Sequence, residues 1–458
     1  MIDCVVENGT VVTAEGSRQV DVGIQSGRVA ALGHGLEAGR RVDAQGCFVF
    51  PGFVDGHVHL QMKVGQIMTG DDFESGTIAA ACGGTTTLID FTENCRGDDL
   101  AEWVEKRHTQ ADGHVAVDYA LHLTLADASV GTLRNLYRLS EAGYRSAKLY
   151  TTYDGVRLAD REFLELLAAA RDARVLPMVH TENDHAIAYL TGRLLSEGKT
   201  APKYHPLSRP PLVEAEAANR VAVLAGLVNA PLYIAHLTCA ETLERIRAAR
   251  GRGQGVYAET CPQYLFLSVD DYDRPGFEGA KYVLSPPLRD KSNWQVLWTA
   301  LKEGELQAVS TDHCPWDYAT QKTLGMQAFD KIPNGAPGIE TRVPLLFHEG
   351  VGKGRLSLQQ FVEVCSTGPA RIFGLYPRKG TIAVGSDADL VIYDPNREVT
   401  LSQANLHQRV DYCPYEGYRV HGYPQTVLLR GQVIVENGQF VGKVGQGEFV
   451  RRQVSCAY

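Results

Sequence analysis

The chain has 458 residues, of which 44% are hydrophobic and 22% are charged, and its formal net charge is −9. This length and apolar content predict one large domain with a smaller one, or two to three ordinary domains, around a sizeable core. The mildly acidic balance argues against a nucleic-acid partner and against binding to an anionic membrane surface.

Short strand and turn patterns dominate residues 1–49. VVENGTVV places Asn8-Gly9 between β-branched residues, and DVGIQSGRVAAL repeats the pattern around Ser26-Gly27, so both segments predict hairpins. Residues 375–458 have the same character, with ADLVIYDP followed by QTVLLRGQVIVENGQFVG and its Asn437-Gly438 turn. Two strand-rich ends around a different middle predict one small β domain, a β-sandwich, built from both ends of the chain and followed by a C-terminal tail.

The middle of the chain, residues 50–374, alternates apolar strand patterns with helical patterns. One helical pattern, CAETLERIRAARGRG, ends in an Arg-rich turn followed by glycine, as helix C-termini often do. The predicted strands cover residues 49–59, 85–91, 115–125, 146–153, 175–182, 231–238, 255–260 and 306–313. Eight strands that alternate with helices predict a (β/α)8 TIM barrel, an α/β fold whose functional side chains lie at the C-terminal ends of the strands.

Cysteine usage and the absence of targeting patterns predict the cellular setting. The ten cysteines are scattered from Cys4 to Cys456 without a CxxC pair, which is typical of reduced thiols rather than of a disulfide framework. The segment MIDCVVENGT has no basic stretch followed by an apolar one, so we expect no signal peptide. No apolar run approaches the roughly 20 residues of a membrane span. We therefore expect a cytoplasmic protein with no membrane partner.

Polar side chains stand at the C-terminal ends of the predicted strands. His57 and His59 end the first strand, in PGFVDGHVH, and they share one side of an extended chain because alternate residues do so. A single histidine in such a place is more often a hydrogen-bonded structural residue. The combination nevertheless predicts a divalent-metal site, because imidazoles and carboxylates at one end of a barrel converge. The other members of the set are Lys148, His180, His236 and Asp312.

Lys148 lies inside the apolar strand SAKLY, where a free ammonium would be unfavourable. A neutral amine in this position can react with carbon dioxide to give a carbamate, whose two oxygens can bridge two metals. The carbamate, Asp312 and a bound hydroxide would balance most of the charge of two divalent cations. His313 and His122 are expected to be structural, since alternation points the first away from the barrel axis.

The sequence resembles the dihydropyrimidinase/D-hydantoinase family of cyclic amidohydrolases over essentially the whole chain. The resemblance rests on PGFVDGHVH, ACGGTTTLIDF, AKLYTTY, VHTEN, APKYHPLSRPPLVEAEA, YIAHLT, ETCPQYL, SPPLRDK, STDHCPW and IPNGAPGIE. It implies a hydrolase that opens the cyclic amide bond of 5-substituted hydantoins or dihydropyrimidines to give N-carbamoyl amino acids. The partner would be this small-molecule substrate, and the relatives are commonly homotetramers.

The resemblance also implies a binuclear metal centre. It would contain two divalent metal ions, usually Zn2+, bridged by a carboxylated Lys148. Carried over to this sequence, the ligands of the more buried metal would be His57, His59 and Asp312, and those of the other would be His180 and His236.

Further roles follow from the resemblance alone. Asp312 would accept a proton from water and later deliver it to the leaving nitrogen. The Tyr153 hydroxyl would stabilise the oxyanion that forms on the attacked carbonyl. Ser285 of SPPLR and Asn334 of PNG would contact the substrate amide, largely through backbone atoms. Without the resemblance, Tyr153 would be interpreted as a packed aromatic, and Ser285 and Asn334 as turn residues.

Three alternatives stay open at this stage. Dihydroorotases carry His-x-His-x-Arg, whose arginine binds the substrate carboxylate, whereas Gln61 occupies that place here. An allantoinase is also compatible, although AKLYTTY and IPNGAPGIE are more similar to the hydantoinase branch. A non-catalytic interaction protein of the same fold, like the collapsin response mediator proteins, would lack the metal ligands. All six ligand positions are filled here, which favours an enzyme.

Overall fold

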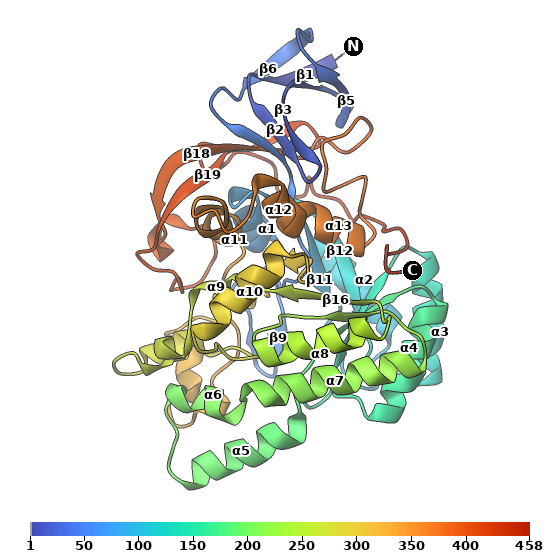
Figure 1. Cartoon of the computed structure of the whole chain (residues 1–458), viewed down its shortest axis with the longest axis vertical. Coiled ribbons are helices and arrows are strands. Elements are labelled where there is room, and N and C mark those ends of the chain that lie inside the picture. The colour runs from blue at the N-terminus through green and yellow to red at the C-terminus, as the bar shows by residue number, and fades with distance from the viewer. Residues whose placement is uncertain (1) are drawn as a thin grey trace.

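The computed structural model describes residues 2–458, and its N-terminal and C-terminal strands form two β sheets at one end of the molecule (Figure 1). The N-terminal strands are β1 (Ile2–Glu7), β2 (Thr10–Thr13), β3 (Gly16–Gln19), β4 (Asp21–Gln25), β5 (Arg28–Gly33), β6 (Ala38–Asp43) and β7 (Phe48–Pro51). The C-terminal strands are β18 (Leu390–Thr400), β19 (Arg419–Leu429), β20 (Gln432–Glu436) and β21 (Gln439–Phe440). One sheet has the order β5-β4-β1-β6, and the other has the order β21-β20-β19-β18-β7-β2-β3. The second sheet therefore joins the C-terminal strands to N-terminal strands where β18 pairs with β7.

The middle of the chain forms a (β/α)8 TIM barrel, as predicted. Its strands are β8 (Phe53–Asp55), β11 (Thr85–Phe91), β12 (Asp118–Thr124), β13 (Ser146–Tyr150), β14 (Leu176–His180), β15 (Leu232–Ile234), β16 (Val256–Thr260) and β17 (Ala308–Val309). They pair in sequence order from β8 to β17, and every pair is parallel. The barrel closes just beyond the strands, where Asp312 N donates to His57 O at 2.9 Å and His59 N donates to His313 O at 2.8 Å.

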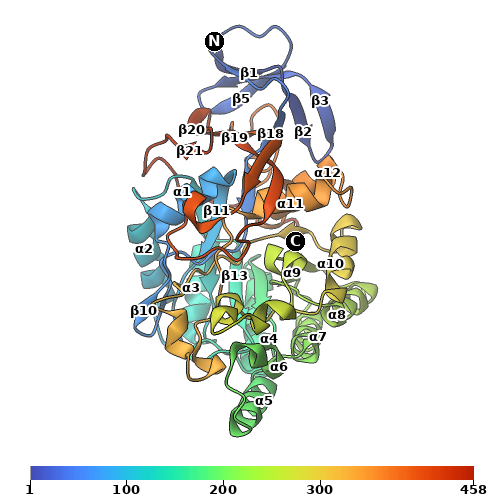
Figure 2. The same cartoon turned by 90° about the vertical axis from the view of Figure 1, so that its left-hand side faces the viewer.

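Helices surround the barrel, and several begin at capping residues. Asp72 accepts a hydrogen bond from Ser75 N at 2.8 Å, and Asn183 accepts one from Ala186 N at 3.0 Å. The longer helices are α1 (Phe73–Cys82), α2 (Leu100–Ala111), α3 (Val130–Glu141), α4 (Asp160–Asp172), α5 (Asp184–Ser196), α7 (Pro211–Leu227), α8 (Ala240–Gly251) and α10 (Ser292–Lys302). The shorter ones are α6 (His205–Ser208), α9 (Pro262–Phe266), α11 (Arg342–Leu346), α12 (Leu358–Val362) and α13 (Gly368–Ile372). Figure 2 shows the terminal sheets at one end of the molecule and α5 at the opposite end. Within residues 2–458, no helix has the length and apolar character that crossing a membrane requires.

The predicted strand at residues 49–59 is divided in the structure. Its first part is β7, which pairs with β18 and β2 in the terminal sheet, and its second part is β8 of the barrel. Gly52 lies at the crossing, where an added Cβ would approach Thr86 Oγ1 to 2.0 Å. Only glycine permits this close approach, so the chain passes from one sheet to the other in a single step.

The predicted hairpin at Asn8-Gly9 is wrong, whereas the other two hairpins are confirmed. β4 pairs with β5 across Ser26-Gly27, and β20 pairs with β21 across Asn437-Gly438. By contrast, β1 pairs with β4 and β6, and β2 pairs with β3 and β7. The hairpin turn predicted there needs a positive φ at both central residues, but in this segment only Asn8 has one, at 65°. The chain therefore changes sheets at this point instead of folding back.

A buried charge network ties the barrel to the terminal sheets. The Lys379 ammonium lies 2.5 Å from an Asp118 oxygen in β12, 2.6 Å from Asp389 and 3.0 Å from Asp387. Arg430, which follows β19, pairs with the other oxygen of Asp118. Two cations thus hold three carboxylates where water is excluded.

We predict that Lys379→Met strongly destabilises the protein, because it leaves buried carboxylates without their shared cation. The free energy of unfolding should fall by about 3–5 kcal/mol, measured by urea denaturation. Lys443→Met, at an exposed lysine, is the matched control. A loss no larger than that of the control would contradict this account of the network.

Candidate metal centre

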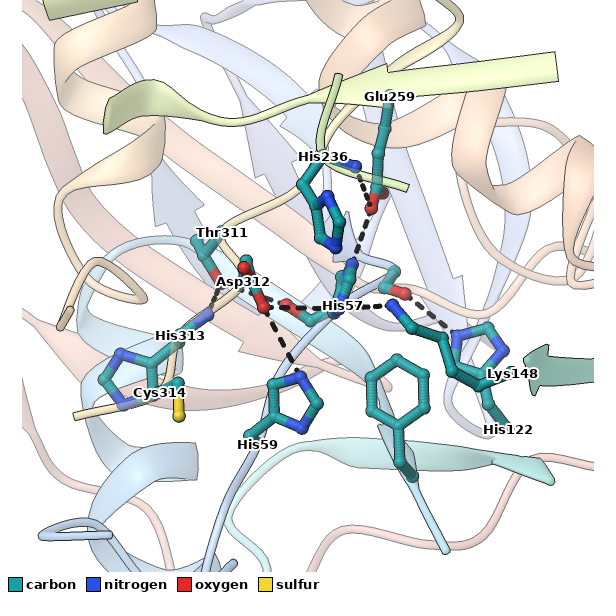
Figure 3. A network of polar contacts seen from close by, with 12 residues as sticks. His57, His59, His122, Lys148, His236, Glu259, Thr311, Asp312, His313 and Cys314 are labelled. Atoms are coloured by element: carbon teal, nitrogen blue, oxygen red, sulfur yellow. Dashed lines mark hydrogen bonds and ion pairs between the residues drawn. The ribbon is translucent and has the colours of Figure 1, made fainter. Parts of the chain in front are cut away.

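The ends of the first, fourth and eighth barrel strands bring four of the predicted residues together. His57 and His59 follow β8, Lys148 lies in β13, and Asp312 follows β17 (Figure 3). Asp312 Oδ1 lies 3.2 Å from His57 Nε2 and 3.4 Å from His59 Nε2. The Lys148 amine lies 3.2 Å from His57 Nε2. Residues more than 250 positions apart in sequence therefore share one buried point.

The remaining two histidines complete the group from the next strand ends. His180 is the last residue of β14, and its ring centroid lies 4.5 Å from that of His236, which follows β15. One ligand atom from each of His57, His236 and Asp312 lies within 4.8 Å of the others. Within the described residues, His236 Nδ1 is buried without a hydrogen-bond partner. A divalent cation would satisfy this nitrogen, so the donor set fits a metal centre.

Three residues of the site adopt a backbone conformation that side chains rarely take. The φ angle is 51° at Asp312, 37° at His236 and 78° at Tyr153. The left-handed region disfavours residues with a Cβ, and such strain gathers at functional sites. Each of these residues lies two or three positions beyond the last residue of its strand, which is Val309, Ile234 or Tyr150.

Glu259 orients His57 and was not anticipated from the sequence. It lies in β16, where its Oε1 accepts a hydrogen bond from His57 Nδ1 at 2.6 Å and its Oε2 accepts one from Tyr233 OH at 2.9 Å. The first contact keeps the proton on Nδ1 and leaves the Nε2 lone pair facing Asp312. Burial raises the pKa of Glu259 to about 7. The only sequence signal was an acidic residue inside the predicted apolar strand at 255–260.

Glu182 has the same role for His180. Its Oε2 lies 2.8 Å from His180 Nε2 and 2.6 Å from the Arg209 guanidinium. Although burial acts to raise the pKa of Glu182, Arg209 and His180 lower it to about 2. With Nε2 engaged in this way, Nδ1 is the ring nitrogen that His180 can offer to a cation.

The ionisation states suit metal binding. Burial lowers the pKa values of His57 and His236 well below the ordinary range, so both rings are neutral and carry a free lone pair. Burial also acts to lower the pKa of His59, but Asp312 and Glu93 raise it to about 9. A metal bound at His59 would displace that proton. Burial lowers the pKa of Lys148 to about 8.

A cavity of about 440 Å³ lies beside this group, and it holds the predicted substrate residues Tyr153 and Asn334. The Tyr153 ring centroid lies 5.1 Å from that of His180. Burial raises the pKa of Tyr153, so its hydroxyl keeps its proton at neutral pH. Ser285 Oγ and Asn334 Oδ1 are buried without a partner in residues 2–458. A second cavity, of about 660 Å³, is lined by residues of the 154–162 segment and by the start of α5. None of the six predicted ligands lines either cavity.

His313 and His122 are structural, as predicted. His313 Nδ1 accepts hydrogen bonds from the backbone of Gly338 and Ile339, and its Nε2 contacts Asp71 at 3.0 Å. Figure 3 shows its ring pointing away from the group around Asp312. His122 bonds to Ser146 Oγ and to Gly56 O at 2.9 Å.

Comparisons with known proteins identify the family of this chain. Residues 48–434 match the model of the amidohydrolase family. The chain belongs to the amidohydrolase family. It is 49% identical over 451 residues to a D-hydantoinase of Geobacillus stearothermophilus, covering 98% of this chain and 96% of the relative. It is 46% identical over 454 residues to a D-hydantoinase of Ralstonia pickettii, covering 99% of each.

The solved structures give the same result for the fold. The crystal structure of a dihydropyrimidinase from Brevibacillus agri superposes with a TM-score of 0.98 at 45% identity, covering 100% of both chains. Terminal sheets and barrel therefore share one arrangement in the two proteins. Metal dependence is typical of the amidohydrolase family, and the His57, His236 and Asp312 group is where this amidohydrolase would hold a cation.

We predict that Glu259→Gln weakens metal binding without unfolding the amidohydrolase. An amide can donate as well as accept, so it no longer keeps the His57 proton on Nδ1. Zinc affinity should fall by roughly 10–100-fold, measured by competition with a chelator. Glu303→Gln, at an exposed glutamate, is the control, and equal affinities in the two variants would show that Glu259 does not orient His57.

Proposed function

We propose that this amidohydrolase opens the cyclic amide bond of 5-substituted hydantoins or dihydropyrimidines and releases N-carbamoyl amino acids. The observation that carries the proposal is the convergence of six ligand-type side chains beside the cavity that contains Tyr153 and Asn334. The names of the relatives, D-hydantoinase and dihydropyrimidinase, support the substrate class.

The residues that would hold two zinc ions are His57, His59, Lys148, His180, His236 and Asp312. Such ions supply Lewis acidity and lower the pKa of water to near neutrality. Lys148 is proposed to act as its carbamate, in which the amine nitrogen bonds to the carbon of CO2 and one proton is lost. Its burial supports this form, because the reaction needs a neutral amine and Nζ lies 3.2 Å from the neutral His57 ring.

The proton-moving and oxyanion-binding groups come from the chain itself. Asp312 would take a proton from the attacking water and pass it to the ring nitrogen that leaves. Its Oδ1 lies 3.2 Å from His57 Nε2 and 3.4 Å from His59 Nε2, so a metal held by these nitrogens would also hold its carboxylate in place. The Tyr153 hydroxyl would donate a hydrogen bond to the carbonyl oxygen as negative charge develops there.

The deciding experiment compares turnover of dihydrouracil with that of the two enantiomers of 5-phenylhydantoin by the zinc-loaded protein. The side chains of Ile187, Leu195 and Phe329 line the cavity, so we expect the aryl hydantoin to be opened faster. The names of the D-hydantoinase relatives favour the D-enantiomer. Faster opening of dihydrouracil would favour a dihydropyrimidinase. No turnover of any of the three would refute the proposal.

A dihydroorotase is disfavoured, because Gln61 provides no cation for a substrate carboxylate.

We predict that Lys148→Ala abolishes turnover and lowers the metal content, because it removes the bridging group. Short carboxylic acids such as acetate should restore part of the activity by occupying the space of the carbamate. Metal analysis and hydrolysis rates with and without acetate are the measurements, with Lys302→Ala on the exposed end of α10 as control. Full activity with both metals in Lys148→Ala would exclude the carbamate.

We also propose a homotetramer in the cytoplasm. Eight of the ten free cysteines are buried, which suits a reducing compartment.

Helices α5, α6 and α7 carry exposed apolar side chains that a subunit interface would cover. These are Tyr189, Leu207, Leu212 and Leu227.

Leu212→Glu should shift the protein from a tetramer to smaller species, because a charge in an apolar interface is unfavourable. The measurement is light scattering after size exclusion. Val130→Glu on α3, where the valine is also exposed, is the matched control. A wild-type monomer would remove the proposal, and an unchanged tetramer in Leu212→Glu would place the interface elsewhere.

A further inference from the structure

Lys322 is a buried cation without a role in the site described so far. It begins the short 3-10 helix Lys322–Gly325, and its side chain is 0% exposed. Its ammonium donates to the carbonyls of Val283, Pro333 and Gly335, each at 2.7 Å. An ammonium has three hydrogens, so these bonds use all of them. Burial lowers the pKa of Lys322 to about 7 although Cys314 acts to raise it, and three carbonyl acceptors favour the charged form.

The three carbonyls belong to the two loops that carry the predicted substrate residues Ser285 and Asn334. Two further hydrogen bonds fix the segment around Asn334. Trp316 Nε1 donates to Asn334 O at 2.8 Å, and Gly335 N donates to Val283 O at 3.1 Å. In the described chain, the peptide N–H of Asn334 reaches no protein acceptor. A native protein seldom leaves such a donor unpaired, and Asn334 lines the 440 Å³ cavity.

Peptide geometry connects Lys322 to that free donor. In a trans peptide, the carbonyl of Pro333 and the N–H of Asn334 point in opposite directions. By holding the Pro333 carbonyl, Lys322 turns the Asn334 N–H away from itself. We infer that Lys322 is a positioning residue, which fixes the Pro333–Asn334 peptide so that its N–H meets the ring amide of the substrate. This inference rests on the proposed function.

Gly335 fixes the same peptide relative to the reacting groups. Its φ is 134°, and an added Cβ would lie 2.4 Å from Cys314 O, two residues beyond Asp312. The loop is therefore pressed onto the segment that carries the proton-moving carboxylate. Because Lys322 and Cys314 hold the loop from two sides, the distance between the Asn334 N–H and Asp312 is set by the protein before substrate binds.

The test is a comparison of Lys322→Met with Lys331→Met, an exposed lysine on the same segment. The first variant should raise KM for 5-phenylhydantoin by roughly 10–100-fold and leave kcat within about threefold, because it disturbs a contact made before the chemical step. Its metal content should equal that of the wild type. A KM equal to that of Lys331→Met would overturn the inference, and so would a loss of metal with unchanged KM.

If Lys322→Met does not fold, Lys322→Arg decides, since it keeps the charge but cannot reach three carbonyls in the same way. A roughly 10-fold higher KM is then expected.

Hydrogen exchange measured by mass spectrometry separates this inference from the proposed function. Deuterium uptake by peptides covering residues 328–338 should rise in Lys322→Met and not in Lys331→Met, whether or not a substrate is known. Unchanged uptake would overturn the positioning role. Wild-type protein that opens none of the tested substrates would instead refute the proposed function, and exchange would still show whether Lys322 holds the loop.

Discussion

The closure of the barrel is the constraint on which the site depends. Two backbone hydrogen bonds join residues 57–59 to residues 312–313 and so connect the first and last strands of the barrel. They place His57 beside Asp312, although the chain between them includes every other barrel strand. Parallel strands end at one rim, and a closed sheet directs their last side chains inward. Ligands from separate strands can then meet without a dedicated loop.

Electrostatics at the rim depends on pairs of side chains rather than on single ligands. Each of His57 and His180 is held from behind by a buried carboxylate, Glu259 and Glu182 respectively. The low polarity that keeps imidazoles neutral also makes an unpaired carboxylate costly, and Arg209 and Tyr233 offset this cost. The orientation of His57 and His180 therefore depends on the glutamates that contact them and on the partners of those glutamates.

Much of this could be predicted from the sequence, because strand periodicity and histidine are conspicuous. The barrel strands and the His57, His59, His180 and His236 set stand out as polar residues after apolar runs. Glu259 and Glu182 do not, since a carboxylate in a short strand looks the same whether it faces solvent or a histidine. The division of residues 49–59 was also hidden, because both halves are apolar and they differ in partner strands that lie elsewhere in the sequence. The positive φ at Asp312 is imposed by tertiary packing, which local propensity does not encode.

The step at Gly52 has a consequence for the order of folding. β7 pairs with β2 on one side and with β18 on the other, so the strand that leads directly into the first ligand strand waits for residues 390–393 to complete its pairing. During synthesis from the N-terminus, the barrel strands emerge before this partner exists, and the terminal sheet is completed last. The ribosome must therefore release almost the whole chain before β7, and with it the path leading to His57, has its final hydrogen bonds. A chain truncated before residue 390 would leave β7 paired with β2 alone, so a loss near the C-terminal end would weaken the strand that leads to the first ligands.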